Sequence, residues 1–192
     1  MRVGVLALQG DFAEHLGAFA GCQVEALEIR RPQELDTLAG LIMPGGESTT
    51  IGMLMERFGL LEQVRVRAQQ GMAIWGTCAG MILLAKDIVG SNQPRLGLMD
   101  IAVERNAYGR QIESFEAPLT VKGIEGGPIT GVFIRAPVVR SVGPECEVLS
   151  EHGGEPVLVQ QGRLLASSFH PELTEDLRLH RYFLALAAYP ER

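Results

Sequence analysis

The sequence predicts a three-layer α/β domain in which a mostly parallel central sheet is covered by helices on both faces, with antiparallel strands added in the second half. Two observations indicate this fold class. Short apolar runs alternate with helical patterns through the first half, as in a parallel sheet. The second half instead contains a succession of short strand-like segments separated by glycine and proline turns.

Continuous apolar runs in the first half are expected to form the parallel strands. Runs without polar alternation are typical of strands that are buried on both faces of a sheet. The predicted strands are Val3–Leu8, Val24–Ile29, Leu41–Met43 and Met72–Trp75.

Two helical segments follow the first two of these strands. Asp11 is expected to cap a first helix, whose apolar residues recur at helical spacing. Residues 31–40 predict a short helix ended by Gly40, because glycine commonly follows the last turn of a helix. The apolar residues of the first helix are Phe12, Leu16, Phe19 and Ala20.

Two further helices are expected between the third strand and the fourth. Ser48 or Thr49 is expected to cap a helix that runs towards Arg57. Another helix is expected to end near Gly71. Strand and helix thus alternate regularly through the first half of the chain.

Short strands dominate the second half, and one helix closes it. Gln160–Arg163 suits a hairpin turn. Thr174 is expected to cap the final helix, with Leu179, Phe183 and Leu186 on one face. The predicted strands are Met99–Glu104, Phe115–Val121, Val132–Ile134, Val138–Val142, Val148–Ser150, Val157–Gln160 and Leu164–Phe169.

Length and composition favour a single domain over residues 1–192 that works in the cytoplasm. The net charge of −6 argues against nucleic acid or an anionic membrane as the main partner. No apolar run approaches the roughly 18 residues of a membrane span, and the N-terminus lacks the features of a secretory signal. The three cysteines are widely spaced and form no disulfide or metal-binding pattern, which indicates a reducing compartment.

The segment Gly76-Thr77-Cys78-Ala79-Gly80 joins a predicted strand to a helix and resembles a nucleophile elbow with cysteine in place of serine. Such a sharp turn crowds the backbone, so that glycine is needed on either side of the nucleophile. The turn would present Cys78 at the carboxyl end of the sheet, with the N–H of Ala79 as an oxyanion donor. The alternative for Cys78 is a buried small apolar residue.

A thiolate nucleophile needs a base, and His170 is the best placed of the histidines. It follows the apolar strand that ends at Phe169, and Glu172 is close enough in sequence to bond its imidazole. A His-Pro turn alone would be ordinary turn chemistry. His15 and His180 are expected to be solvated or locally bonded, because they lie in the first and last helices.

Residues Pro44–Thr50, with the sequence PGGESTT, form a glycine-rich loop between a strand and a helix. Backbone N–H groups in such a loop are suited to bind an anion or an oxyanion, which makes Gly46 a second oxyanion donor. A phosphate-binding loop is the alternative, but the Walker pattern requires a lysine that this loop lacks.

These motifs, in the order PGGEST, GTCAG and FHPE, resemble the triad class of glutamine amidotransferases. The segments LALQGDFAEH, GTCAGMILLA, VERNAYGRQIESFE, GVFIRAP, VLSEH and SFHPELTED extend the likeness to nearly the whole chain. Together they are similar to the glutaminase subunits of pyridoxal 5′-phosphate synthase. This resemblance implies a flavodoxin-like fold, no cofactor and no metal.

The resemblance also implies an activity, a partner and a set of site residues. The activity is hydrolysis of L-glutamine by a triad of Cys78, His170 and Glu172. The ammonia would pass to a (β/α)₈-barrel synthase subunit that makes pyridoxal 5′-phosphate from a pentose phosphate and a triose phosphate. Gln9 matches a position near the synthase interface. The residues that match glutamine-binding positions are Gly46, Glu47, Ser48, Arg105, Ile134 and Arg135.

The chemistry of glutamine agrees with this set. Arg105 and Arg135 would bind the α-carboxylate, and Glu47 would bind the α-amine. The simpler roles are a surface charge for either arginine and a helix cap for Glu47.

Three other functions remain open at this stage. One is the glutaminase subunit of another amidotransferase, such as imidazole glycerol phosphate synthase. The second is a non-catalytic or chaperone-like member of the elbow-cysteine α/β proteins, and the third is a cysteine peptidase. The intact set of Cys78, His170 and Glu172 speaks against the second.

Overall fold

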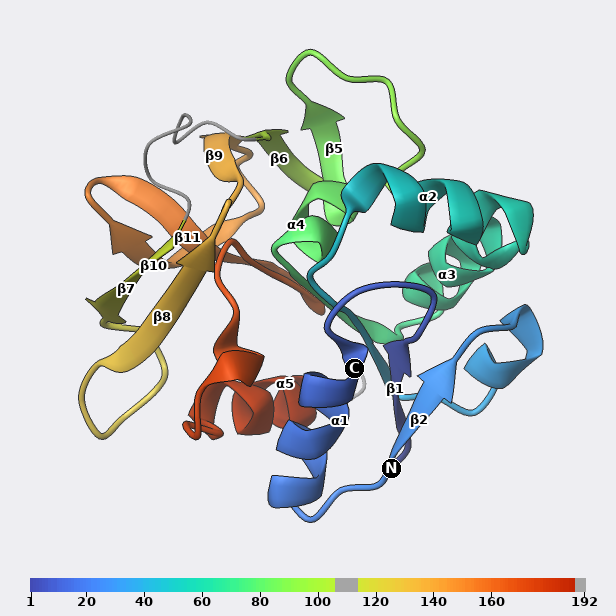
Figure 1. Cartoon of the computed structure of the whole chain (residues 1–192), viewed down its shortest axis with the longest axis horizontal. Helices are drawn as coiled ribbons and strands as arrows, with labels where there is room; N and C mark the ends of the chain where they lie inside the picture. Colours follow the sequence, from blue (N-terminus) through green and yellow to red (C-terminus); the bar gives the residue numbers. More distant parts are fainter. Residues whose placement is uncertain (106–113, 189–192) are drawn as a thin grey trace.

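The computed structural model describes residues 1–105 and 114–188, and a seven-stranded sheet crosses the centre of this part of the chain (Figure 1). Its strand order is β10-β11-β12-β4-β3-β1-β2, in which β2, β1, β3, β4 and β12 run parallel and the β10–β11 edge is antiparallel. The predicted fold class is confirmed. These strands are β1 (Val3–Leu6), β2 (Ala26–Ile29), β3 (Gly40–Met43), β4 (Ala73–Thr77), β10 (Glu147–His152), β11 (Glu155–Gln161) and β12 (Leu164–Ser167).

Helices cover both faces of this sheet (Figure 1). Helices α2, α3 and α4 pack against one face, and α1 and α5 pack against the other. The helices are α1 (Phe12–Gly21), α2 (Ser48–Arg57), α3 (Leu60–Gln69), α4 (Ala79–Leu84) and α5 (Arg178–Ala188), with short 3₁₀ turns η1 (Pro32–Leu35) and η2 (Pro171–Leu173).

Two apolar cores result, one on each face of the sheet. Along β4, Ile74 contributes to the core under α2 and α3, whereas Trp75 contributes to the core under α1 and α5. Both side chains are fully buried. Burial on both faces explains why the parallel strands are continuous apolar runs in the sequence.

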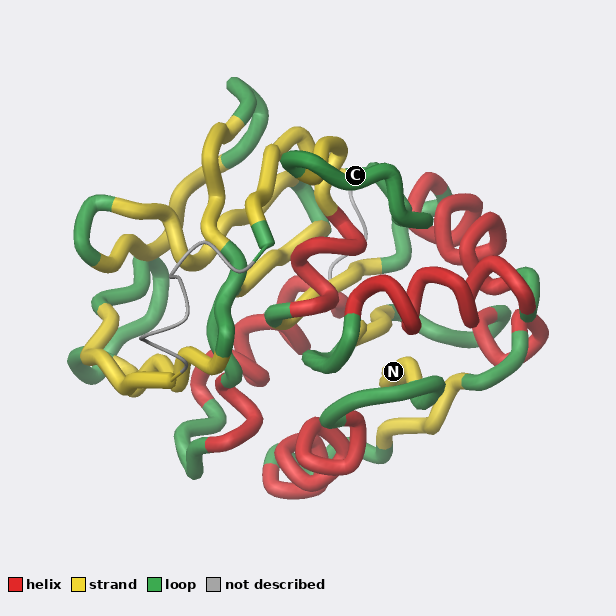
Figure 2. Tube along the Cα trace, turned by 45° about the horizontal axis from the view of Figure 1, so that its top comes forward, coloured by secondary structure: helices red, strands yellow, loops and turns green. Residues whose placement is uncertain are grey.

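Two smaller sheets extend this frame, one at the left and one near the top of Figure 1, and strands gather in the left half of Figure 2. The first combines β5 (Ala85–Ile88), β6 (Met99–Glu104) and β9 (Val138–Val142), and the second pairs β7 (Ser114–Leu119) with β8 (Ile129–Ile134). The last residue of β6 directly precedes Arg105, and β8 ends at Ile134. The added strands therefore bring the predicted substrate-binding residues to the central sheet.

Several expected helix boundaries are wrong. Glu47, rather than Ser48 or Thr49, is the N-cap of α2, because its carboxylate accepts the backbone N–H of Thr50 at 2.7 Å. Asp11 occupies the N-cap position of α1 but makes no capping hydrogen bond.

The ends of two other segments also differ from expectation. The expected helix over residues 31–40 is only the short turn η1, and Gly40 already begins β3. Helix α5 starts at Arg178, where Asp176, rather than Thr174, accepts the backbone N–H at 3.0 Å. Strand β5 was not predicted, because its central residues, Lys86 and Asp87, are charged.

The last strand, β12, lies in the parallel part of the sheet beside β4, and not among the antiparallel additions. The hairpin turn predicted at Gln160–Arg163 joins it to β11. This placement matters because β4 leads to Cys78 and β12 leads to His170. Within the described residues, no helix has the length and apolar character needed to cross a bilayer.

Candidate active site

Cys78 lies at a sharp turn between β4 and α4, with φ of 48° and ψ of −101°. A Cβ atom on Gly76 would lie 2.3 Å from the carbonyl of Gly80, and one on Gly80 would lie 2.1 Å from the carbonyl oxygen of Met43. Both contacts are with backbone, which cannot move aside. The two glycines are therefore required by the turn, as the sequence predicted.

His170 and Glu172 form a buried hydrogen-bonded pair after β12. The Nδ1 atom of His170 lies 2.8 Å from Oε1 of Glu172, and both side chains are almost fully buried. The backbone N–H of His170 donates to the carbonyl of Val132 on β8 at 2.8 Å, which fixes the base from a second sheet. Because β12 pairs with β4, this pair lies beside the cysteine.

The surroundings of His170 favour its charged form. Burial alone would lower its pKa, but the hydrogen bonds with Cys78 and Glu172 raise the pKa of His170 to about 10. Burial raises the pKa of Glu172, and the hydrogen bond from His170 opposes that rise. The imidazole is thus suited to exchange a proton with the sulfur.

The glycine-rich loop after β3 lies against this histidine. A Cβ atom on Gly45 would lie 2.3 Å from Cε1 of His170. Gly46 has a φ of +153°, and a Cβ atom there would lie 2.7 Å from Oε1 of Gln9. The backbone N–H of Glu47 donates to the same Gln9 oxygen at 2.8 Å. Gln9 therefore holds the loop that carries the predicted oxyanion donor.

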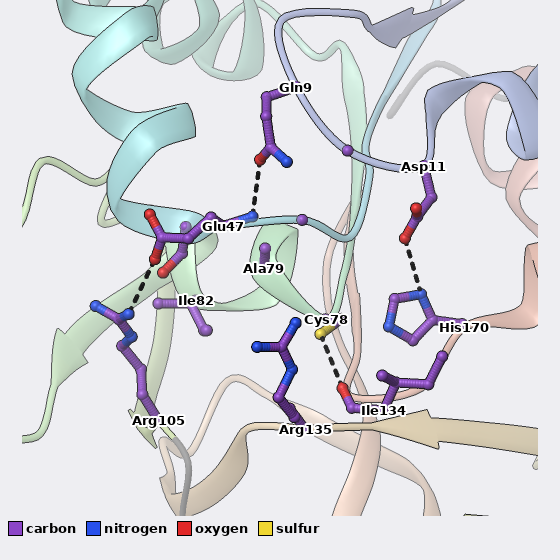
Figure 3. A pocket seen from close by; sticks show the side chains of 13 residues that line it. Gln9, Asp11, Glu47, Cys78, Ala79, Ile82, Arg105, Ile134, Arg135 and His170 are labelled. Carbon is purple, nitrogen blue, oxygen red and sulfur yellow. Dashed lines mark hydrogen bonds and ion pairs between the residues drawn. The ribbon is translucent and has the colours of Figure 1, made fainter. Parts of the chain in front are cut away.

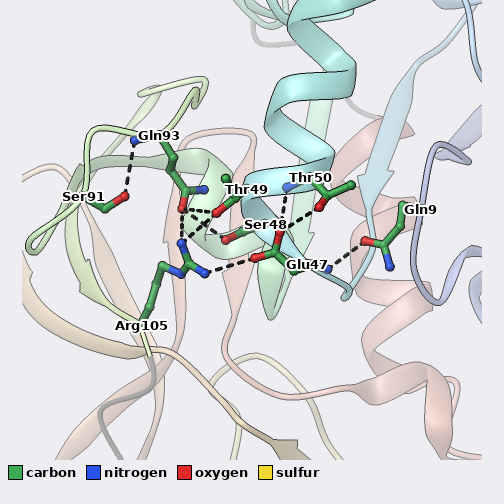
Figure 4. A network of polar contacts seen from close by, with 8 residues as sticks. All are labelled: Gln9, Glu47, Ser48, Thr49, Thr50, Ser91, Gln93 and Arg105. Atoms are coloured by element: carbon green, nitrogen blue, oxygen red, sulfur yellow. Dashed lines mark hydrogen bonds and ion pairs between the residues drawn. The ribbon is translucent and has the colours of Figure 1, made fainter.

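Figure 4 shows a polar network at the start of α2. Arg105 donates to Oε1 of Glu47 at 3.1 Å, to Oγ1 of Thr49 at 2.9 Å and to Oε1 of Gln93 at 2.5 Å. The pKa of Glu47 is lowered: burial alone would raise this pKa, but hydrogen bonds from Thr50 and Thr49 and the charge of Arg105 outweigh burial. Glu47 and Arg105, which we expected to bind opposite ends of glutamine, are thus paired with each other.

Arg135 differs from Arg105 because its guanidinium has no hydrogen bond or ion pair with another described residue. Its backbone has a φ of 43°, a left-handed conformation that is uncommon for a residue with a side chain. In Figure 3 the guanidinium points into the pocket between Cys78 and Arg105. It is the better placed of the two arginines to meet an incoming carboxylate.

These residues line one pocket of about 480 Å³ (Figure 3). Every residue predicted for the site is found in its wall except Glu172, which is buried behind His170. Thiol and imidazole thus share one cavity with two arginines and the glycine-rich loop. The lining residues are Gln9, Gly10, Asp11, Gly46, Glu47, Ser48, Cys78, Ala79, Ile82, Arg105, Ile134, Arg135 and His170.

Sequence reasoning missed other polar residues at this site. Asp11 lines the pocket, with Oδ2 3.6 Å from Nδ1 of His170. Gln93 is buried and accepts hydrogen bonds from Ser48, Thr49 and Arg105, but no motif in the sequence marks it. Asp11 could have been found from its position in the loop that follows the first strand.

The expectation that His15 and His180 are solvated or locally bonded is wrong. Both are fully buried, and the Nδ1 atom of His15 lies 3.1 Å from Nε2 of His180 although 165 positions separate them in the sequence. Helical spacing was the available signal, because His15 falls on the same face of α1 as Phe12 and Phe19.

One group of side chains has the geometry to hold a metal ion. Asp11, His170 and Glu172 each offer a ligand atom, all within 4.8 Å of one another. A metal there would have to displace the proton that Nδ1 of His170 shares with Glu172. The buried hydrogen bond between these two side chains is better suited to orient an imidazole.

Comparison with known proteins places these observations in one family. Residues 5–188 match the model of the SNO glutamine amidotransferase family. A protein of Thermus thermophilus, named pyridoxal 5′-phosphate synthase subunit PdxT, is 61% identical over 187 residues, or 96% of this chain and 97% of its own. A protein of the same name from Desulforamulus reducens is 54% identical over 186 residues, covering 97% and 99% of the two chains.

Solved structures agree with this likeness. A crystal structure described as a glutamine amidotransferase has a TM-score of 0.94 and 59% identity, and the match covers 97% of this chain and 99% of the other. A protein of Thermoplasma acidophilum described as part of a putative GMP synthase has a TM-score of 0.71 at 17% identity over 98% and 94% of the two chains, a likeness of fold alone.

Proposed function

Because this chain belongs to the SNO glutamine amidotransferase family, we propose that it hydrolyses L-glutamine to L-glutamate and ammonia with Cys78, His170 and Glu172 as its triad. The observation that carries this proposal is the elbow cysteine on β4 beside the buried histidine–carboxylate pair after β12, all at one pocket. Residues 1–192 act as one glutaminase domain. The chemistry requires no cofactor or metal.

The reaction proceeds through a thioester. The sulfur of Cys78 attacks the side-chain amide carbon of glutamine, and the oxyanion that forms is bound by the N–H groups of Gly46 and Ala79. His170 donates its proton to the departing ammonia. It then takes a proton from water, whose oxygen attacks the thioester carbon and releases glutamate, so that the sulfur is restored. Glu172 orients the imidazole throughout.

The pocket selects glutamine by its charged end. Arg135 binds the α-carboxylate, since its guanidinium points into the pocket without another partner among the described residues (Figure 3). Arg105 adds a second positive charge, and Glu47 supplies a carboxylate for the α-amine. Ser48 and Ile134 complete the wall around the substrate.

The names of the relatives support a destination for the ammonia. Both relatives described above are named subunits of pyridoxal 5′-phosphate synthase. The chain therefore joins a (β/α)₈-barrel synthase subunit in a cytoplasmic hetero-oligomer, which makes pyridoxal 5′-phosphate from a pentose phosphate and a triose phosphate. Gln9 couples this partner to the oxyanion loop through its hydrogen bond with Glu47. The same names favour this pathway over imidazole glycerol phosphate synthase.

A glutaminase assay of the complex tests the proposal. The chain is mixed with a pyridoxal 5′-phosphate synthase subunit, the complex is isolated, and ammonia release from glutamine is measured. We expect Cys78→Ala to reduce kcat by at least about 10³-fold, because the nucleophile is lost. His152→Gln, which changes a histidine on β10, is the matched control and keeps the wild-type rate.

Two results would contradict the proposed function. Ammonia release by Cys78→Ala at the native rate would exclude the thioester. Failure of the wild-type chain to release ammonia with this partner, together with capture of the histidine-pathway cyclase, would favour the other amidotransferase.

A further inference from the structure

Two buried histidines lie directly behind the proposed triad, and the mechanism above does not use them. His15 of α1 and His180 of α5 are both fully buried in the core beneath the central sheet. Their rings pack against Trp75 of β4, at centroid distances of 5.9 and 5.1 Å. Two polar rings in an apolar core are costly unless they are hydrogen-bonded, so their contacts show what retains them.

The contacts of His15 lead to Glu172. Its Nε2 atom lies 3.4 Å from Oε2 of Glu172 and 3.2 Å from Oγ1 of Thr77, the residue before the nucleophile. Oε1 of Glu172 is occupied by His170 at 2.8 Å. Oε2 is buried and forms no hydrogen bond with a described residue, although Nε2 of His15 lies 3.4 Å from it. Nε2 of His15 is therefore the ring nitrogen placed to offer a proton to the second oxygen of this carboxylate.

The hydrogen-bond pattern selects one tautomer. With its proton on Nε2, His15 faces Oγ1 of Thr77 at 3.2 Å and Oε2 of Glu172 at 3.4 Å, and its Nδ1 accepts from Nε2 of His180 at 3.1 Å. His180 is then left with an unprotonated Nδ1, which has no hydrogen-bond partner among the described residues. The opposite tautomer would direct a lone pair of His15 at the carboxylate and leave a buried N–H of His180 unpaired.

The groups around His15 keep it neutral. It faces His180 from α5, Glu172 and His170 from the η2 segment, and Thr77 from β4. Burial first, and then the charges of His180 and His170, hold the pKa of His15 well below its usual value. His15 therefore supplies a hydrogen-bond donor to Glu172 without placing a second positive charge beside His170.

We propose that His15 is a positioning residue of the glutaminase, which donates from Nε2 to Oε2 of Glu172, while His180 fixes its tautomer. The path from the sulfur then runs through His170 and Glu172 to His15 and His180. This inference rests on the proposed function. The role of His15 is to hold the carboxylate of Glu172 ionised and in the plane that His170 requires.

A substitution of His15 should affect the chemical step and not substrate binding. His15 does not line the pocket, so the KM for glutamine should change by less than about twofold. Loss of one hydrogen bond to a charged group reduces kcat by about tenfold or more in His15→Leu. The acid limb of the kcat profile should also move to higher pH, because Glu172 loses a donor that favours its ionised form.

His15→Gln is the conservative variant, because its side-chain amide can present an N–H near the position of Nε2. It should restore most of the lost kcat and return the acid limb towards the wild-type pH. His152→Gln is the matched control and should leave both unchanged. All variants are assayed as complexes with the synthase subunit. Wild-type kcat and an unshifted profile in His15→Leu would overturn the inference, as would equal losses in the Leu and Gln variants.

A spectroscopic measurement on the unmodified chain makes the test independent of folding and of activity. In protein labelled with ¹⁵N-histidine, the ring nitrogens of His15 should report a neutral ring protonated at Nε2 at pH 7. Protonation at Nδ1, or a charged ring, would overturn the inference. If wild-type protein releases no ammonia, the proposed function fails. If the wild type is active and His15→Leu has the same kcat, only the inference about His15 fails.

Discussion

The two walls of the pocket are built in different ways. The wall that carries Cys78 and His170 is fixed by backbone, since the glycines around it have no room even for a Cβ atom. The wall that carries Glu47 and Arg105 is held by side-chain hydrogen bonds, and about half of the Glu47 side chain is exposed. In the proposed reaction, the first wall must keep reacting atoms within a few tenths of an ångström, whereas the second must recognise a charged ligand that enters from water.

This difference predicts where substitutions are costly. Changes in the backbone-fixed wall should damage the fold together with the chemistry, because no neighbour can move aside. Changes in the other wall should alter substrate affinity and leave the fold intact, because exposed ion pairs contribute little to stability.

The strongest test of this contrast is Gly80→Ala. The new Cβ atom would meet the carbonyl oxygen of Met43 at 2.1 Å, so that α4 or β3 must shift. We expect a loss of about 3 kcal/mol in the free energy of unfolding, measured by urea denaturation. A variant as stable as the wild type would show that the turn has room and would break the comparison.

The second largest expected effect is a loss of stability at low pH, because the histidines behind the backbone-fixed wall are buried in neutral form. Burial lowers the pKa of His180 to about 4, so between pH 6.5 and 4 the unfolded chain binds a proton that the folded chain refuses. Stability is therefore lost as the pH falls through this window. We expect His180 to account for about 2–3 kcal/mol of the loss at pH 4.5.

Urea denaturation of wild type and His180→Leu at pH 7 and pH 4.5 measures this contribution. The variant should show a flatter dependence on pH, while His152→Gln keeps the wild-type slope. Equal slopes for all three proteins would mean that His180 does not resist protonation in the fold.

The recognition wall is tested by Arg105→Ala and Arg135→Ala. Each should raise the KM for glutamine by about tenfold or more, because a hydrogen bond to a charged group contributes about 1.5–3 kcal/mol. Steady-state assays of the complex give KM and kcat separately. Unchanged KM in both variants would remove these arginines from the site.

The two arginines should differ in stability. Arg105→Ala removes one of several donors to Glu47 and to Gln93, and we expect it to lower the free energy of unfolding by about 1 kcal/mol or less. Arg135→Ala removes no hydrogen bond or ion pair between described residues and should leave stability unchanged. The same urea denaturation experiment distinguishes them, and equal losses would contradict the assignment of Arg135 as the unpaired cation among the described residues of the pocket.

The smallest expected effect is a gain. Gly17 is an exposed glycine within α1, and a Cβ atom there would meet nothing within 4 Å. Gly17→Ala should stabilise the chain by about 0.5–1 kcal/mol, because alanine loses less backbone entropy in a helix. It is therefore the matched control for Gly80→Ala, and a similar loss in both would show that the cost does not come from the elbow.

The sequence predicted the backbone-fixed wall better than the recognition wall, for physical reasons. The elbow around Cys78 depends on a local steric requirement, which glycine meets in a pattern that can be read directly. The network around Arg105 joins residues from distant loops, and Gln93 enters it only because the chain folds back. No local pattern encodes such a contact.

The buried histidines show a different kind of miss. The helical spacing of His15 placed it on the apolar face of α1, but the polar character of its ring argued for solvent. Its partners come from η2, α5 and β4, so only the assembled fold shows how an imidazole is satisfied in that core. The parallel position of β12 was missed for a similar reason, because strand direction depends on the path of the whole chain.

The place of β12 in the sheet bears on the order in which the protein matures. Strand β12 lies between β4 and β11, and it leaves the ribosome well after the segment that carries Cys78. Until then the nascent polypeptide carries Cys78 without His170, next to an open edge of the sheet that can pair with other strands. In the proposed mechanism, the sulfur therefore has no base until the segment that closes the sheet delivers this imidazole.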